Sequence, residues 1–109
     1  MGARDHLGEF EILVLLAIMR LRDDAYGMRI RRELEQRGKR STSIGALYIT
    51  LDRLEGKGFV QSRLDDATPE RGGRPKRFFT VNAAGKQVLR ESLNAFRSLA
   101  QGLSLPGVV

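Results

Sequence analysis

The segment SIGALYITLDRLEGKGFVQSRL, residues 43–64, decides the fold together with RGGRPKRFFTV, residues 71–81. In the first segment, leucines recur at i, i+4 and i+7 (Leu47, Leu51 and Leu54), which is the spacing of one buried face of a helix. We therefore expect a helix that begins after an N-cap at Thr42 or Ser43 and ends near residue 57.

Two stretches rich in Phe and Val follow this helix, at residues 59–64 and 76–81, and we expect them to pair as strands. The turn between them carries four basic residues and no acidic ones from Arg71 to Arg77. Such a turn can lay Arg74, Lys76 and Arg77 along a phosphate backbone or into a minor groove. The alternative is a solvated hairpin tip without a partner.

The helix face opposite the leucines carries mainly small residues: Gly45, Ala46, Ile49, Thr50 and Arg53. Small residues let a helix approach the edge of a base. Ile49 can then contact a thymine methyl group, and Arg53 a guanine or a phosphate. An ordinary amphipathic helix with a plain surface is the alternative interpretation.

The composition fits a single small domain with a polyanionic partner. The chain has 109 residues and a net charge of +6, which favours binding to nucleic acid without proving it. Cysteine is absent, so disulfides and thiolate metal sites are excluded. The longest apolar run, at residues 12–19, is far shorter than the roughly 20 residues that span a bilayer. We expect a cytoplasmic protein without a cofactor, a metal or a membrane partner.

Three more helices are expected around this unit. The first, near residues 7–21, is apolar almost all the way round, which indicates burial on more than one side. Asp23 and Asp24 are expected to cap the second helix, and Gly38 to end it. The last helix, near residues 83–103, is expected to be capped by Asn82.

The last helix carries apolar residues spaced as in a coiled-coil seam: Leu89, Leu93, Phe96, Ala100 and Leu103. With Phe10 and Leu13 of the first helix, this seam predicts a homodimer interface. A helix packed on its own domain is the alternative. The expected fold is mainly α with a small β-hairpin. It comprises a winged helix-turn-helix DNA-binding domain at residues 1–82, a C-terminal dimerisation helix at 83–103 and a flexible tail at 104–109.

Nearly the whole chain, from about residue 7 to residue 103, resembles the PadR family of bacterial winged-helix transcription regulators. The resemblance rests on motifs in this order: Tyr26-Gly27, Gly45-Ala46-Leu47-Tyr48, Leu51, Leu54-Glu55, Gly58, Gly73-Arg74-Pro75, Lys76-Arg77-Phe78-Phe79 and Val81-Asn82-Ala83-Ala84-Gly85. It implies a homodimer held by the C-terminal helix and the first helix, and binding to a roughly palindromic DNA operator, usually as a repressor.

Carried over to this sequence, the resemblance implies that Ser43, Tyr48, Ile49 and their neighbours, Thr42 among them, face the DNA. Tyr48 has a structural alternative, with its ring in the core and its hydroxyl on a phosphate, and the two roles are compatible. The family often has Pro where this chain has Ile49, which puts the bases read there in doubt. It often has Thr where this chain has Asn82, an equally good cap. Members of the family often respond to a small hydrophobic or aromatic effector at the dimer interface, which Phe10 and Phe96 could line here. Against such a site, the chain has no Trp and a single C-terminal helix leaves little room for a large pocket, so plain core packing is the alternative for both residues.

Three competing functions were weighed. An enzyme is disfavoured because the single histidine, His6, lies near no nucleophile or metal-ligand motif. Adhesion to a membrane would need a continuous cationic amphipathic helix, which the arginines of the second helix do not form. The serious alternative is a winged-helix module for protein–protein contact. Such a surface would need a larger apolar patch than Ile49 provides.

Overall fold

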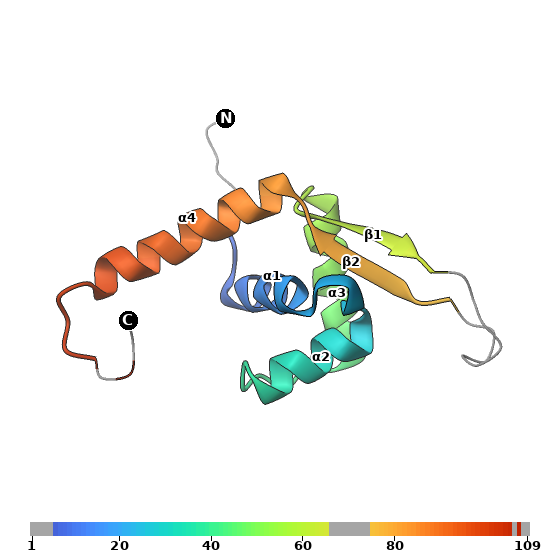
Figure 1. Ribbon diagram of the computed structural model, residues 1–109, viewed down its shortest axis with the longest axis horizontal. Helices are drawn as coiled ribbons and strands as arrows, with labels where there is room; N and C mark the ends of the chain where they lie inside the picture. The colour runs from blue at the N-terminus through green and yellow to red at the C-terminus, as the bar shows by residue number, and fades with distance from the viewer. Residues whose placement is uncertain (1–5, 66–74, 106, 108–109) are drawn as a thin grey trace.

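The computed structural model describes residues 6–65, 75–105 and 107. A three-helix unit packs against two antiparallel strands, and a long C-terminal helix extends from the unit in the direction away from these strands (Figure 1). The expected fold class is confirmed. In chain order the elements are α1 (Glu9–Leu21), the short helix η1 (Arg22–Asp24), α2 (Gly27–Gln36), α3 (Ile44–Gly56), β1 (Val60–Leu64), β2 (Arg77–Val81) and α4 (Ala83–Ala100).

Helix α1 is the centre of the core, as its apolar sequence predicted. Five of its apolar side chains are buried: Ile12, Val14, Leu15, Ala17 and Ile18. The helix contacts α2, α3, α4 and β2. A helix that packs against four other elements needs apolar residues on several sides, which accounts for its nearly continuous apolar run.

The start of α2 differs from the prediction. Asp23 and Asp24 lie in η1, and Tyr26 is the N-cap of α2 without a side-chain cap bond. The cause is a tertiary contact, in which the backbone before α2 pairs with strand β2 of the hairpin. Tyr26 forms a β-bridge with Phe78, and the N–H of Phe79 donates to the carbonyl of Ala25 at 2.9 Å. The helix can begin only after these extended residues.

Helix α3 and the hairpin follow the predicted pattern closely. The Ser43 hydroxyl accepts a hydrogen bond from the N–H of Ala46 at 3.0 Å, so Ser43, not Thr42, is the N-cap. The three leucines of α3 are fully buried: Leu47, Leu51 and Leu54. The strands pair in antiparallel register from Val60↔Val81 to Leu64↔Arg77. The expected start of the second strand at residue 76 is thus one residue early.

Helix α4 begins where expected and ends earlier. The Asn82 side chain accepts a hydrogen bond from the N–H of Gly85 at 3.0 Å. The helix ends at Ala100, not at Leu103. Leu89, expected in the dimer seam, is buried in the core of its own chain. The C-terminal half of α4 extends away from the other helices (Figure 1), and Phe96, Leu99 and Leu103 are 56%, 79% and 62% exposed.

Candidate nucleic-acid interface

The outward face of α3 is built as the sequence indicated, with one exception. Ser43, Gly45 and Ala46 are exposed, and Ile49 is 63% exposed. Thr50, expected on this face, is only 5% exposed. It follows Leu47 by three residues and precedes Leu54 by four, and this spacing puts it at the edge of the buried leucine face. The exposed face is therefore narrower than predicted.

A hollow of about 380 Å³ lies beside the first turns of α3. Its lining comes from α1, from the loop before α3 and from α3 itself: Phe10, Arg40, Ser41, Thr42, Ala46, Ile49, Thr50 and Arg53. The Arg40 guanidinium stacks 5.4 Å from the centre of the Phe10 ring. Phe10, expected at the dimer interface, thus lies on the side of α1 that faces this hollow and α3.

The loop that leads into α3 is held by an arginine of α2. The Arg31 Nε donates to the carbonyl of Thr42 at 2.7 Å, directly before the Ser43 cap. Lys39 has a φ of 54°, in the left-handed region that bulky side chains rarely adopt. The loop is therefore a defined turn, and it presents Arg40 beside the start of α3.

Tyr48 has the structural role that the sequence left open. Its ring lies 6.2 Å from that of Phe79, centre to centre, and packs on the first residue of α2, Gly27. A Cβ at Gly27 would lie only 2.5 Å from the Tyr48 hydroxyl oxygen. The glycine of the Tyr26-Gly27 motif therefore makes room for the tyrosine of α3, and the hydroxyl lies at the N-terminal end of α2.

Arg77, predicted to contact DNA, instead joins the hairpin to α3. Its guanidinium pairs with Asp52 at 3.0 Å and with Glu55, and its Nε donates to the Ser62 hydroxyl at 3.2 Å. Burial alone would lower the Arg77 pKa, but the hydrogen bonds and negative charges of Asp52 and Glu55 outweigh it and raise the pKa above its usual value. With its donors engaged by Asp52 and Glu55 of α3 and by Ser62 of β1, Arg77 is an ion-paired residue within the protein.

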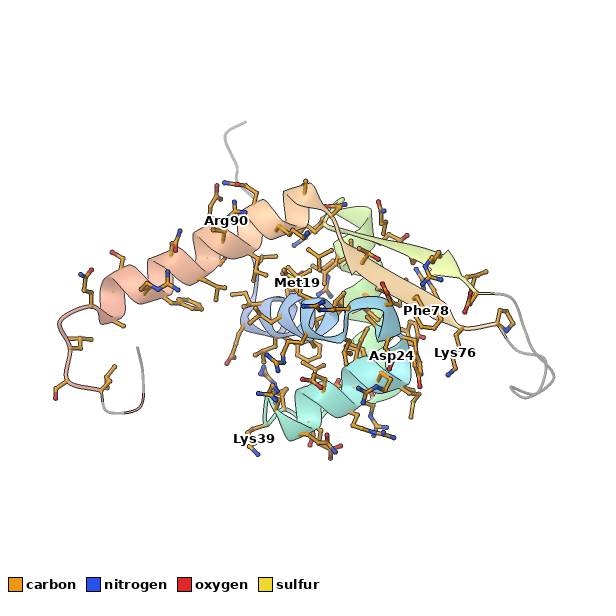
Figure 2. The ribbon with its side chains drawn as sticks, in the orientation of Figure 1. Met19, Asp24, Lys39, Lys76, Phe78 and Arg90 are labelled. Carbon is orange, nitrogen blue, oxygen red and sulfur yellow. The ribbon has the colours of Figure 1, made fainter. Side chains whose placement is uncertain are left out.

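The other cations of the hairpin stack on aromatic rings. Lys76 Nζ lies 3.8 Å from the centre of the Tyr26 ring, and the Arg63 guanidinium lies 4.9 Å from that of Phe78. The two rings meet edge-on at 5.5 Å. Figure 2 shows Lys76 and Phe78 where the hairpin meets the start of α2, close to Asp24. Arg74 lies outside the described residues.

Sequence reasoning missed Arg40, Arg63 and Glu11. Arg40 lies in a short basic stretch with Arg37 and Lys39, Arg63 lies in a segment considered only as a strand, and Glu11 interrupts an apolar helix that was interpreted only as core. In the described part of the chain, no group of three His, Cys, Asp or Glu side chains is arranged to hold a metal. Within the same residues, no helix combines the length and apolar character needed to cross a bilayer.

Comparisons with known proteins agree with this architecture. The sequence model of the family described as "Transcriptional regulator PadR-like family" matches residues 15–91. A PadR family transcription regulator from hypervirulent Clostridium difficile shares the fold, with a TM-score of 0.69 and 22% identity over 86% of this chain and 93% of that one.

Two further structures are more similar in sequence. The PadR family transcriptional regulator of Eggerthella lenta is 29% identical, with a TM-score of 0.67 over 86% of this chain and 81% of its own. The complex structure of hsRosR-SG is 26% identical, with a TM-score of 0.69 over 95% of this chain and 84% of that one. The sequence has no match among curated proteins.

Proposed function

The chain belongs to the PadR-like family of transcriptional regulators, and we propose that it binds specific sites on double-stranded DNA as a cytoplasmic repressor. The observation that carries the proposal is the exposed face of α3, where Gly45 and Ala46 leave the helix backbone open to a groove and Ile49 projects beyond them. Small residues allow close approach to base edges, and an isolated apolar side chain suits a thymine methyl group.

The hairpin beside α3 supplies a cation that supports the same function. Lys76, held over Tyr26, is placed to contact a phosphate while α3 lies in the major groove. Arg40 lines the hollow beside the first turns of α3. Contacts to phosphate fix orientation and register, and contacts to base edges supply the sequence preference. In this proposal Lys76 and Arg40 orient the protein, and Ile49 and Arg53 read the sequence.

A homodimer is the second part of the proposal. Three exposed apolar residues are available for it: Phe96 and Leu99 on the last turns of α4, and Leu103 just after the helix. This part of α4 extends beyond the core of its chain (Figure 1). A second copy could cover them with the same surface in a twofold arrangement. Such a dimer places two copies of α3 against two half-sites, which implies an inverted-repeat operator.

The decisive experiment is selection of binding sites from a random duplex library at near-physiological salt. We expect enrichment of an inverted repeat whose half-sites lie about one helical turn apart, or a multiple of it. Ile49→Ala should change the preferred sequence without unfolding the protein. Met28→Ala is the matched control, because Met28 is likewise exposed, at 53%, but lies on α2. No enrichment by folded protein would refute DNA reading.

Salt dependence separates this function from a protein–protein module. Binding that neutralises several phosphates weakens steeply as salt is raised, whereas apolar contact does not. The exposed surface of α3 favours DNA binding over protein contact, because it carries no large apolar patch. Its exposed large apolar residues are Ile49, at 63%, and Ile44, at 37%. Affinity for the selected duplex that stayed constant between low and high salt would support the protein-contact alternative instead.

A further inference from the structure

We propose that Glu11, a buried carboxylate on α1, is a specificity-determining positioning residue that restrains Arg53 of α3 and keeps its guanidinium from binding phosphates indiscriminately. The inference rests on the proposed DNA-binding function and specifies how one of its residues is controlled. Glu11 itself lies behind α3 and would not touch the DNA.

The burial of Glu11 calls for an explanation. It is 6% exposed and, with Thr50, one of the two buried polar or charged residues among those described. A buried carboxylate is strongly unfavourable unless it is paired and hydrogen-bonded. Here Oε1 accepts the backbone N–H of Gly8 at 2.8 Å, and Oε2 lies 3.3 Å from Lys57 Nζ and 3.8 Å from Arg53 Nη1.

The two cations that meet Glu11 have different surroundings. Lys57 is largely covered, with a side chain 26% exposed, and it neutralises the carboxylate from within. Arg53 is 52% exposed and lies one turn earlier on the same side of α3, next to the hollow with Ile49. Lys57 alone could neutralise the negative charge of Glu11. The main effect of the second ion pair is therefore on Arg53, whose outward-facing side chain it restrains.

The pairing leaves Arg53 able to read a base. A guanidinium has five N–H donors, and in the described structure only Nη1 approaches a carboxylate, at a distance too long for a hydrogen bond. The remaining donors stay available for the two acceptors of a guanine. Asp52 and Glu55, the carboxylates of α3 itself, are paired with Arg77. Glu11 is therefore the group that restrains Arg53.

The restraint affects specific and non-specific binding in opposite ways. A guanidinium held near a carboxylate loses less freedom when it meets a base at the fixed position. Turning away toward any nearby phosphate would instead leave the Glu11 pairing. Removal of the negative charge should free Arg53 to bind phosphates on every sequence. The ratio of specific to non-specific affinity should fall, and the salt dependence of non-specific binding should become steeper.

The test compares wild type, Glu11→Gln, Arg53→Ala and the double variant on the selected duplex and on a scrambled duplex. Glutamine retains the acceptor for the Gly8 N–H and removes the charge. We expect Glu11→Gln to lower the specificity ratio about threefold, the size of the effect of a partly exposed ion pair, and to steepen the logarithmic salt slope on scrambled duplex by about one unit, one extra phosphate contact. In the Arg53→Ala background, Glu11→Gln should have no further effect on the ratio.

An unchanged specificity ratio in Glu11→Gln would overturn the proposal. It would also be overturned if Glu11→Gln lowered the ratio equally in the Arg53→Ala background, because Glu11 would then have a merely structural role. Lys57→Gln is the control, because it disturbs the same carboxylate from the other side and should change the ratio less. If wild type enriches no site at all, the proposed function fails and this inference fails with it. An enriched wild-type site with an insensitive Glu11→Gln defeats the inference alone.

A measurement on the unmodified protein covers the case in which Glu11→Gln does not fold. Nitrogen-15 relaxation of the Nε–H group reports the order of each arginine side chain. We expect Arg53 to be more ordered than Arg32, an exposed arginine of α2. Equal mobility of the two side chains in the free protein would refute the restraint.

Discussion

Replacing Gly85 with alanine should destabilise the protein, although alanine is the better helix former. Gly85 lies in the first turn of α4, where the helix crosses the start of the hairpin. An added Cβ would overlap the carbonyl oxygen of Phe59 and come within 2.8 Å of Val81 Cγ1. The Phe59 carbonyl cannot retreat freely, because it accepts the N–H of Asn82 at 3.0 Å.

The size of the effect follows from three opposing contributions. Alanine in place of glycine stabilises a helix by about 1 kcal/mol. Overpacking costs about 1–3 kcal/mol, and weakening the hydrogen bond between Phe59 and Asn82 costs about 1 kcal/mol more. The net loss is about 1–3 kcal/mol. In a domain of this size each kcal/mol shifts the melting temperature by about 4–8 °C, so we expect Tm to fall by about 5–20 °C.

Thermal unfolding followed by circular dichroism measures this change, with the protomer concentration held constant because association would shift Tm. Gly56→Ala is the matched control. Gly56 ends α3, and an added Cβ would meet no atom within 4 Å, so only the helix preference remains and Tm should rise slightly. A Gly85→Ala protein that melts at or above the wild-type temperature would refute the packing argument.

Two further predictions concern the hairpin and α4. Arg77→Ala removes the ion pairs with Asp52 and Glu55 that fix the hairpin to α3. We therefore expect a lower Tm, and a loss of affinity that is larger for the selected duplex than for scrambled DNA. A uniform loss on both duplexes, measured by fluorescence anisotropy, would instead make Arg77 a phosphate contact. Phe96→Asp with Leu99→Asp should give folded monomers in light scattering, and a persistent dimer would exclude this surface as the interface.

The parts of the fold that could be predicted from the sequence depend on neighbours a few residues apart. The leucine spacing of α3 and the caps at Ser43 and Asn82 each involve partners within one or two helical turns. Helix periodicity and capping hydrogen bonds between residues so close in sequence can be predicted from residue type and spacing alone. The hairpin was also predictable, because two short Phe/Val-rich segments flank a turn.

The remaining differences arise from contacts between distant segments. Asp23 and Asp24 have the chemistry of caps, but the backbone that follows them is drawn into a bridge with β2. Leu89 fits a coiled-coil spacing equally well whether it faces its own core or a second chain. Charge alone also cannot tell a cation that is free for DNA from one, such as Arg77, that is paired within the protein. Each of these distinctions requires the tertiary arrangement.

The internal ion pairs bear directly on recognition, because they hold α3 from two sides. Arg77 fixes one side of its C-terminal half to the hairpin through Asp52 and Glu55, and Glu11 fixes the other to α1 through Lys57. The first turn stays exposed and carries Gly45 and Ala46, whose small side chains contribute little binding area. In the proposed complex with DNA, a helix that read bases through so few atoms would depend on accurate placement. The internal ion pairs of Arg77 and Lys57 would then support specificity by holding α3 in place.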